Sequence, residues 1–282
     1  MTPEPDTGFA EAIQAVCPGF RAIEALPARK SEVLAGEIDG EPVVAKRLAR
    51  ANDVWAWYFE REVAIYRAFV ERPPPFRVPA LRAASAGLLV IERMPGAPFA
   101  VRRSPQAEVA ELDKVLALEH QITTYDFPTT PRPSPAVRSQ LRARFLEDAT
   151  SPDWIRDGIA RAARRKLLPA NTAAKIAMQL EDVTAPSHGD LLLRNVIGGV
   201  LVDWECAGRH LVDWDLALLW TQLAPAQRPR VEAAAKSRAF FGIVAFALAR
   251  ELSFLHAFRK GPRHANVSRI TAELDGVCKR IG

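Results

Sequence analysis

The chain has few of the residues that cross-link small secreted proteins. Its 282 residues include three cysteines, an odd and widely spaced set. No Cys-x-x-Cys spacing occurs among Cys17, Cys206 and Cys278, so the sequence indicates neither a disulfide framework nor a zinc site built on cysteine pairs. A protein of this kind is expected in a reducing, cytoplasmic compartment.

Long apolar runs and targeting signals are also lacking. The longest apolar run, residues 239–249, is too short to span a bilayer and is followed directly by Arg250 and Glu251. The first residues carry Glu4 and Asp6 and lack the basic-then-apolar order of a targeting peptide. We therefore expect no membrane as a partner.

Charge of one sign is not concentrated in any part of the sequence. The formal net charge is +5, from 38 lysines and arginines against 33 aspartates and glutamates. The densest basic cluster, residues 161–166, lies on a predicted amphipathic helix and is typical of a solvated helix face. Without a basic stripe or an aromatic platform, nucleic acid is not an expected partner. The length and the 49% hydrophobic content fit a globular protein with two buried cores.

The most informative stretch of the chain begins at residue 188. Residues 188–195 are His-Gly-Asp-Leu-Leu-Leu-Arg-Asn, and residues 202–205 are Val-Asp-Trp-Glu. The carboxylate of Asp190 is thus followed by the amide of Asn195 and by a second carboxylate at Asp203. Phosphoryl transfer requires this order. Asp190 would orient an acceptor hydroxyl and take its proton, while Asn195 and Asp203 would hold Mg²⁺ against the nucleotide phosphates.

The residues around this motif predict its local structure. Apolar residues on both sides predict a loop, a short strand, a turn at Gly198-Gly199 and a second strand. Such a hairpin would bring Asn195 and Asp203 to one metal ion although seven residues separate them. The alternative is a polar loop between two buried strands, in which the aspartate only caps a helix.

The two parts of this motif resemble the aminoglycoside phosphotransferase and choline kinase group of small-molecule kinases. In that group His-Gly-Asp replaces the His-Arg-Asp of protein kinases, and Asp-Trp or Asp-Phe replaces Asp-Phe-Gly. The Asp-Leu-Ala at residues 215–217 extends the similarity, which is specific over residues 188–217. Only nine residues separate Asp203 from Asp213, which leaves no room for the long activation segment of a protein kinase. The acceptor is therefore expected to be a small molecule.

The resemblance implies an α+β, protein-kinase-like fold of two lobes. Residues 1–93 would form a small N-terminal nucleotide-binding lobe with an antiparallel sheet and one main helix. Residues 94–282 would form a larger, mostly helical catalytic and acceptor-binding lobe. The implied cofactors are Mg²⁺ and ATP, with GTP as the alternative, and the implied partner is a small molecule with a free hydroxyl. The oligomeric state is not predicted.

A strand with a central lysine is predicted near the N-terminus. Residues 43–48 alternate around Lys46, and the Asp39-Gly40 turn signal joins them to a partner strand at residues 32–38. Lys46 would point toward the nucleotide phosphates, and an edge-strand lysine in solvent is the alternative.

A helix over residues 54–70 follows and carries two glutamates. Glu62 is favoured as the partner of Lys46, and Glu60 is the alternative.

The adenine site and the phosphate cover are predicted from the resemblance alone. Residues 92–96, Glu-Arg-Met-Pro-Gly, resemble the family hinge, where backbone groups of Glu92 and Met94 would meet adenine. An ordinary exit from a strand would suit the same residues. The sequence departs from kinases in lacking Gly-x-Gly-x-x-Gly before Lys46, which leaves open how the γ-phosphate is covered. Side chains of the 27–31 loop, Ser31 among them, are the candidates.

Four further residues are predicted to support the site or bind the acceptor. We call residues 188–195 the catalytic loop. His188 is expected to position this loop rather than to act as a base, and Asp215 is expected to hold it. Glu205 and Glu251 are the candidate acceptor-binding carboxylates. Further helices are predicted over residues 106–124, 135–149, 152–168, 171–180, 212–223, 229–258 and 266–281.

The acceptor is predicted only by class. The Ala-, Arg- and Pro-rich composition is common in high-GC bacteria, many of which carry antibiotic self-resistance kinases. We therefore expect an antibiotic, either an aminoglycoside or a basic cyclic peptide of the capreomycin and viomycin type, and resistance as the result. A metabolite kinase acting on choline, homoserine or a sugar is the alternative. An inactive nucleotide-binding scaffold should have lost one of the key residues, all of which are present: Lys46, Asp190, Asn195 and Asp203.

Overall fold

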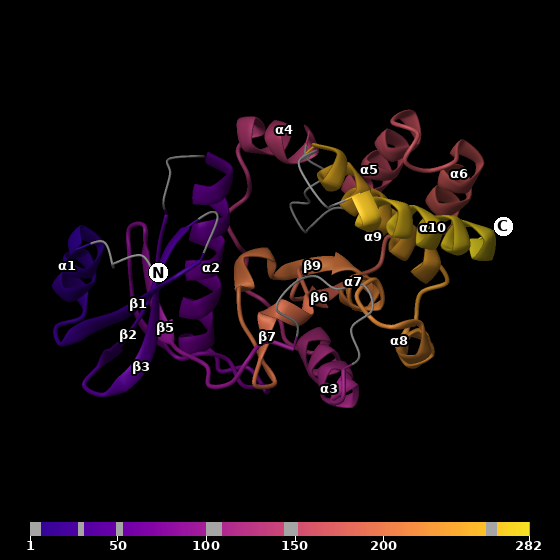
Figure 1. Ribbon diagram of the computed structural model, residues 1–282. Helices are drawn as coiled ribbons and strands as arrows, with labels where there is room; N and C mark the ends of the chain where they lie inside the picture. Colours follow the sequence, from indigo (N-terminus) through magenta and orange to yellow (C-terminus); the bar gives the residue numbers. More distant parts are fainter. Residues whose placement is uncertain are drawn as a thin grey trace. The chain divides into compact units, whose positions relative to one another are not determined.

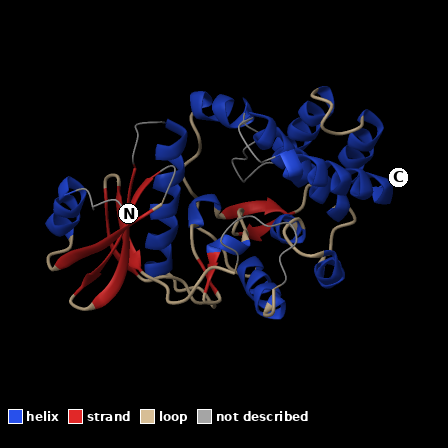
Figure 2. Ribbon diagram, viewed as in Figure 1, coloured by secondary structure: helices blue, strands red, loops and turns tan. Residues whose placement is uncertain are grey.

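The computed structural model describes residues 7–27, 31–48, 53–99, 109–143, 152–257 and 264–281 (Figure 1). The chain forms two compact units. The first unit comprises Met1–Phe99, Phe127–Pro131 and Asn195–Cys206. The second unit comprises Ala100–Asp126, Arg132–Arg194 and Ala207–Gly282. Strands dominate the first unit and helices the second (Figure 2), so the predicted α+β class is confirmed.

A five-stranded antiparallel sheet of order β1-β2-β3-β5-β4 is the centre of the first unit. Its strands are β1 (Phe20–Leu26), β2 (Ser31–Ile38), β3 (Glu41–Leu48), β4 (Leu81–Ser85) and β5 (Leu88–Glu92). The predicted hairpin joins β2 to β3. Asp39 and Gly40 form its turn with φ of 51° and 84°, and Asp and Gly are residues that accept this left-handed conformation.

Two helices cover the sheet from opposite sides (Figure 1). Helix α1 (Thr7–Val16) buries its apolar face against alternate strand residues, Val43 and Ala45 among them. Since successive side chains of a strand point to opposite faces, Lys46 must face the other side, where α2 (Asp53–Glu71) lies. The alternation of β3 therefore decides that the lysine meets α2.

A buried tryptophan joins α2 to the segment after Asp203. Trp204 begins the short helix η2 (Trp204–Cys206) and is fully buried. Its ring packs against those of Phe69, Phe76 and Phe127, with centroid distances of 5.0, 5.6 and 6.0 Å. Aromatic pairs at such distances add to the free energy gained from burial. This cluster fixes the start of η2 on the helix that carries Glu62.

Helices make up most of the second unit, and the most apolar of them is at its centre. Helix α9 (Phe240–Ala257) is buried along nearly its whole described length. Gly158 of α5 packs so closely against Phe246 that a Cβ there would lie 2.7 Å from the ring. A two-stranded sheet of β6 (Thr184–Ser187) and β9 (Gly208–Leu211) flanks the catalytic motif. The other helices are α3 (Leu112–Thr123), α4 (Pro135–Ala143), α5 (Pro152–Arg164), α6 (Ala170–Gln179), α7 (Trp214–Trp220), α8 (Arg228–Ala234) and α10 (His264–Ile281), with the short η1 (Leu193–Asn195) and η3 (Pro225–Gln227).

The single helix predicted over residues 229–258 is wrong. Helix α8 ends at Ala234 and α9 begins at Phe240. The carboxylate of Asp213 accepts hydrogen bonds from the N–H groups of Lys236 at 2.8 Å and Ser237 at 2.5 Å. This contact from a distant part of the chain stabilises the break, which the apolar pattern does not reveal.

The helix predicted over residues 106–124 begins at Leu112, and residues 106–108 lie outside the described part of the chain. None of the helices that the structure describes combines the length and apolarity that crossing a bilayer requires.

Candidate active site

Lys46 is the centre of a charged cluster in the first unit. Its Nζ donates to Glu62 Oε1 at 2.7 Å and to Asp203 Oδ1 at 3.0 Å. The Glu62 side chain is only 3% exposed, whereas Glu60 is exposed on another face of α2. Of the two candidate glutamates, Glu62 is therefore the one that meets the lysine.

The two carboxylates control the charge of the lysine. Burial alone would lower the pKa of Lys46, but Asp203 and Glu62 raise it, and the pKa stands well above its ordinary value. Lys46 is therefore a cation at neutral pH. One ammonium group thus bridges two carboxylates that belong to different segments of the chain.

Tyr66 lies one helical turn after Glu62 and was not singled out from the sequence. Its side chain is 1% exposed, and its hydroxyl has no hydrogen-bond partner within the described structure. Burial raises the pKa of this phenol well above its ordinary value, and Glu62 raises it further. Tyr66 is therefore a neutral, buried hydroxyl beside the charged cluster.

A hairpin brings Asn195 close to Asp203, as the spacing predicts. Strands β7 (Val196–Ile197) and β8 (Val200–Leu201) pair, and the Val202 N–H donates to the Asn195 carbonyl at 2.9 Å. Asp203 follows directly, in a left-handed conformation with φ of 68°. An amide oxygen and a carboxylate are ligands that suit Mg²⁺, so these residues fit a magnesium site.

The turn of this hairpin is fixed by close packing within the first unit. Gly198 lies so near Pro95 that a Cβ there would be 2.4 Å from the proline carbonyl oxygen. Its φ of 55° is also a conformation that glycine adopts readily. Only glycine suits this position, and the hairpin register that places Asn195 depends on it.

Arg61 anchors the segment after Asp203 and was also missed from the sequence. The residue is 1% exposed, and its Nε donates to the Glu205 carbonyl at 3.1 Å. Its guanidinium lies over the Trp57 ring, 4.8 Å from the centroid. A charged residue on the apolar face of α2 was the available signal. The contact holds the Glu205 backbone. It does not involve the Glu205 carboxylate, whose acceptor role stays a prediction.

In the second unit, a buried carboxylate holds the catalytic loop. Asp215, 2% exposed, accepts the N–H groups of His188 at 2.6 Å and Gly189 at 3.0 Å. The indole of Trp214 donates to the Gly189 carbonyl at 2.9 Å, and His188 Nδ1 accepts the Asp190 N–H at 3.3 Å. The backbone at Asp190 is thus fixed without use of its carboxylate.

A glutamine completes the hold on this loop. Gln222 Oε1 accepts the Leu193 N–H at 2.9 Å, and its Nε2 donates to the Leu191 carbonyl at 3.1 Å. The carboxylate of Asp190 is partly exposed and lies 3.8 Å from the guanidinium of Arg194. No local pattern points to Gln222, because its partners are 29 and 31 residues away.

Glu119 of α3 has a raised pKa, and one cause is Asp215, the residue that holds the catalytic loop. Burial, together with the carboxylates of Asp215 and Asp213, raises the pKa of Glu119 from 4.5 to about 8, and Lys236 opposes the rise. Burial also raises the pKa of Asp215, while His188 lowers it. With a pKa of about 8, Glu119 therefore favours its neutral form at neutral pH.

The raised pKa of Glu119 predicts a pH-dependent stability. A folded-state pKa above the unfolded value gives stability that is complete below about pH 4.5 and lost as the pH rises to about 8. Between these values the free energy of unfolding should fall by up to about 1.4 kcal/mol per pH unit. Chemical denaturation at several pH values should show this slope in the wild type and a smaller one in Glu119→Gln. An unchanged slope would contradict it, and Glu111→Gln, at the exposed start of α3, is the control.

The predicted nucleotide-base residues lie at the end of β5. The Glu92 N–H donates to the Ala80 carbonyl at 2.8 Å, and its carboxylate accepts from Arg77 and from the Ala80 N–H, both at 3.1 Å. Met94 is buried, and Ser31 is half-buried opposite Leu48 at the start of β2. Their nucleotide contacts stay predictions.

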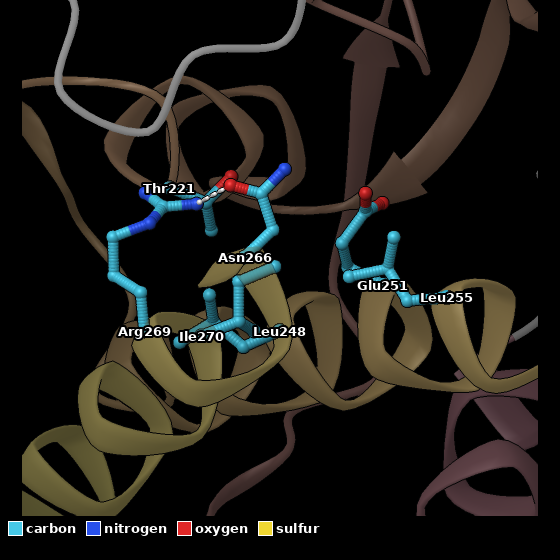
Figure 3. A pocket seen from close by; sticks show the side chains of 7 residues that line it. All are labelled: Thr221, Leu248, Glu251, Leu255, Asn266, Arg269 and Ile270. Carbon is cyan, nitrogen blue, oxygen red and sulfur yellow. Dashed lines mark hydrogen bonds between the residues drawn. The ribbon is translucent and has the colours of Figure 1, made fainter. Parts of the chain in front are cut away.

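Glu251 lines a pocket between α9 and α10 in the second unit (Figure 3). Arg269, Asn266 and Thr221 gather at one end, where Arg269 Nη2 donates to Asn266 Oδ1 at 3.4 Å, and Glu251 lies at the other end with Leu255. The pocket thus carries one acidic and one basic side chain. Among the residues that the structure describes, no group of three or more His, Cys, Asp or Glu side chains could hold a metal ion.

Comparison with known proteins identifies the family. Residues 28–254 match the sequence model of the phosphotransferase enzyme family. The chain belongs to this family. The predicted family and the assignment as a phosphotransferase are therefore confirmed.

Three solved structures share the fold. The aminoglycoside phosphotransferase APH(4)-Ia, solved with AMP-PNP and hygromycin B, is 16% identical, with a TM-score of 0.59 over 98% of this chain and 99% of that one. The GDP and kanamycin complex of APH(2")-IIia is 11% identical, with a TM-score of 0.61 over 98% and 99%. A choline/ethanolamine kinase family protein from Mesorhizobium loti is 16% identical, with a TM-score of 0.61 over 96% and 94%.

These identities show the fold alone, and the predicted kinase-like fold is confirmed. No curated protein sequence matches the chain.

Proposed function

We propose that this phosphotransferase transfers the γ-phosphoryl group of ATP to a hydroxyl of a small cationic antibiotic. The observation that carries the kinase part is the cluster in which Lys46 bridges Glu62 and Asp203. A lysine held by a helix glutamate beside a metal-binding aspartate is the phosphate clamp of protein kinases. The family membership of the chain supports the same chemistry.

On the nucleotide side, residues of the first unit would act together. Lys46 would bind the phosphates while Glu62 keeps its ammonium in place. Asn195 and Asp203 would hold Mg²⁺, which neutralises charge on the phosphates during transfer. The backbone of Glu92 and Met94 would bind the base. Either ATP or GTP is compatible with the fold, since relatives were solved with AMP-PNP and with GDP.

On the acceptor side, Asp190 would orient the attacking hydroxyl and accept its proton. The carboxylate is suited to this role because its loop is held by Asp215 and Gln222 through backbone atoms only. His188 would support the loop and take no proton from the acceptor. Asp190 belongs to the second unit and Asn195 to the first, five residues along the chain.

The small size of the acceptor is supported by the chain after Asp203. The short helix η2, strand β9 and helix α7 follow one another directly, and this whole stretch is described. No activation segment or peptide platform lies there. Cationic antibiotics are supported by relatives solved with hygromycin B and kanamycin. Glu205 and Glu251 are the carboxylates that we propose as cation partners.

A metabolite kinase is the second candidate. The similarity to a choline/ethanolamine kinase family protein favours it, and choline carries both a hydroxyl and a cation. Homoserine and sugars would be the other acceptors of this class. The division of the chain after residue 93 and the cytoplasmic location stay proposals under either function.

A transfer assay distinguishes the two candidates. The purified protein, Mg²⁺ and ATP or GTP would be incubated with aminoglycosides, basic cyclic peptides, choline, homoserine and sugars. We expect a cationic antibiotic to gain the mass of one phosphoryl group. Turnover of only choline, homoserine or a sugar would establish the metabolite kinase instead.

The same assay tests Glu251. Glu251→Gln should raise KM for the cationic acceptor by about 10-fold, the effect of losing one hydrogen bond to a charged group, with KM for the nucleotide unchanged. Asp275→Asn, an exposed carboxylate on α10, is the matched control. An unchanged acceptor KM in Glu251→Gln would remove this residue from the acceptor site.

A further inference from the structure

Tyr66 carries the one buried tyrosine hydroxyl that has no hydrogen-bond partner in the described structure. Its ring is fixed on α2, where it packs edge-on against Phe69 with a centroid distance of 6.0 Å. Burying an unpaired hydroxyl is costly, and folded proteins keep few such groups. Phenylalanine would fill the same space without that cost. The hydroxyl therefore points to a partner that another state of the protein supplies.

The charged groups that act on this hydroxyl are Glu62, Lys46 and Asp203. Tyr66 follows Glu62 by one helical turn, so both side chains lie on the same face of α2. Lys46 is the shared donor of this cluster, at 2.7 Å from Glu62 and 3.0 Å from Asp203. A phenol with an ordinary pKa of about 10 is protonated at neutral pH, so Tyr66 is available as a donor.

The function proposed above requires Lys46 in a second position. An ammonium group that binds nucleotide phosphates must weaken its contact with Asp203. The Asp203 oxygen then loses its 3.0 Å contact with the ammonium group, while its second oxygen has to face the metal. Tyr66 is the buried donor whose own hydrogen bond is not yet made.

We propose that the Tyr66 hydroxyl is a positioning donor for Asp203. It hydrogen-bonds the carboxylate oxygen that Lys46 releases when the nucleotide binds, and so keeps Asp203 oriented toward Mg²⁺. The inference rests on the proposed function and concerns a residue that touches neither the nucleotide nor the acceptor. Its effect should appear in magnesium binding and not in recognition of the base.

Tyr66→Phe tests the inference with two measurements, thermal stability without nucleotide and magnesium dependence with AMP-PNP. Without nucleotide, the variant should melt at the wild-type temperature or about 2–4 °C above it, because a buried unpaired hydroxyl is removed. With AMP-PNP, the Mg²⁺ concentration that half-saturates Mg²⁺-dependent binding should rise about 10-fold, as expected for one hydrogen bond to a charged group. AMP-PNP affinity without Mg²⁺ should not change. Calorimetry and thermal melting measure both.

Two further variants make the test specific. Tyr58→Phe removes a hydroxyl from another buried tyrosine of α2, whose ring contacts Trp55 and Trp57, and should not change the magnesium dependence. In an Asp203→Ala background, Tyr66→Phe should have no further effect on AMP-PNP binding, since the group that it positions is gone.

Two results would overturn the inference. A nucleotide-free Tyr66→Phe protein that melts several degrees lower would show that the hydroxyl already has a partner. A wild-type magnesium dependence in Tyr66→Phe would show that it does not position Asp203. If the wild-type protein itself bound AMP-PNP without any response to Mg²⁺, the proposed function would fail as well, so the two failures are distinguishable.

Discussion

Replacing Asp190 by alanine is expected to lower kcat by about 10²–10⁴-fold, the range for loss of a positioned acid–base group. The affinity for nucleotide should stay within about twofold of the wild type, because the proposed nucleotide contacts come from other residues. The loop should keep its structure, since Asp215 and Gln222 hold it through backbone groups. Steady-state kinetics on the identified acceptor, with AMP-PNP binding by calorimetry, measure both quantities.

The control for this experiment is a carboxylate remote from the loop. Asp113→Ala removes an exposed side chain of α3 whose ion pair with Arg230 is of the surface kind that contributes little. It should keep the wild-type kcat. Near-full turnover by Asp190→Ala would exclude Asp190 as the group that positions the hydroxyl.

Replacing Asp203 by alanine is expected to abolish the magnesium-dependent part of nucleotide binding. Without this carboxylate, Asn195 alone would face the metal, and one neutral ligand does not hold Mg²⁺. Lys46 would keep its partner Glu62, so the fold should survive. Calorimetry of AMP-PNP with and without Mg²⁺ would show equal affinities in the variant and different ones in the wild type.

A substitution of Asp203 is easier to interpret than a substitution of Lys46. Removal of Lys46 would leave the buried carboxylate of Glu62 without its cation, which costs about 3–5 kcal/mol for such pairs, and unfolding would confuse the result. Glu60→Ala is the control for Asp203→Ala. Glu60 is an exposed carboxylate of the helix that carries Glu62, so its removal should leave the response to Mg²⁺ unchanged. An Asp203→Ala protein with a wild-type response to Mg²⁺ would contradict the metal site.

The parts of the site that could be predicted are those encoded by neighbours in the chain. The alternation of residues 43–48 and the Asp39-Gly40 turn predict the β2–β3 hairpin, and the glycines after Asn195 predict the turn before Asp203. In both hairpins, period and turn chemistry act over a few residues, where sequence patterns are informative. The choice of Glu62 over Glu60 came instead from the resemblance to the family, in which a glutamate pairs with the lysine.

The parts that could not be predicted depend on contacts between distant segments. Asp213 stabilises the break between α8 and α9 from 23 and 24 residues away, so the apolar run after the break wrongly suggested one long helix. The strands β6 and β9 are four residues each and show no clear alternation. Gln222 and Tyr66 look like ordinary helix residues until the fold places them beside the catalytic loop and the Lys46 cluster.

Growth of a sensitive bacterium in the presence of the antibiotic tests the central proposal most directly. The strain would express the wild-type protein or Asp190→Ala at equal levels, with minimum inhibitory concentrations measured across aminoglycosides and basic cyclic peptides. A phosphate added to a cationic drug blocks a hydroxyl and cancels positive charge with which the drug binds RNA phosphates. Modification should therefore protect the cell. We expect the wild type to raise the inhibitory concentration of at least one such drug and Asp190→Ala to raise none. Equal sensitivity of both strains to every drug, or equal protection by both proteins, would contradict the proposal.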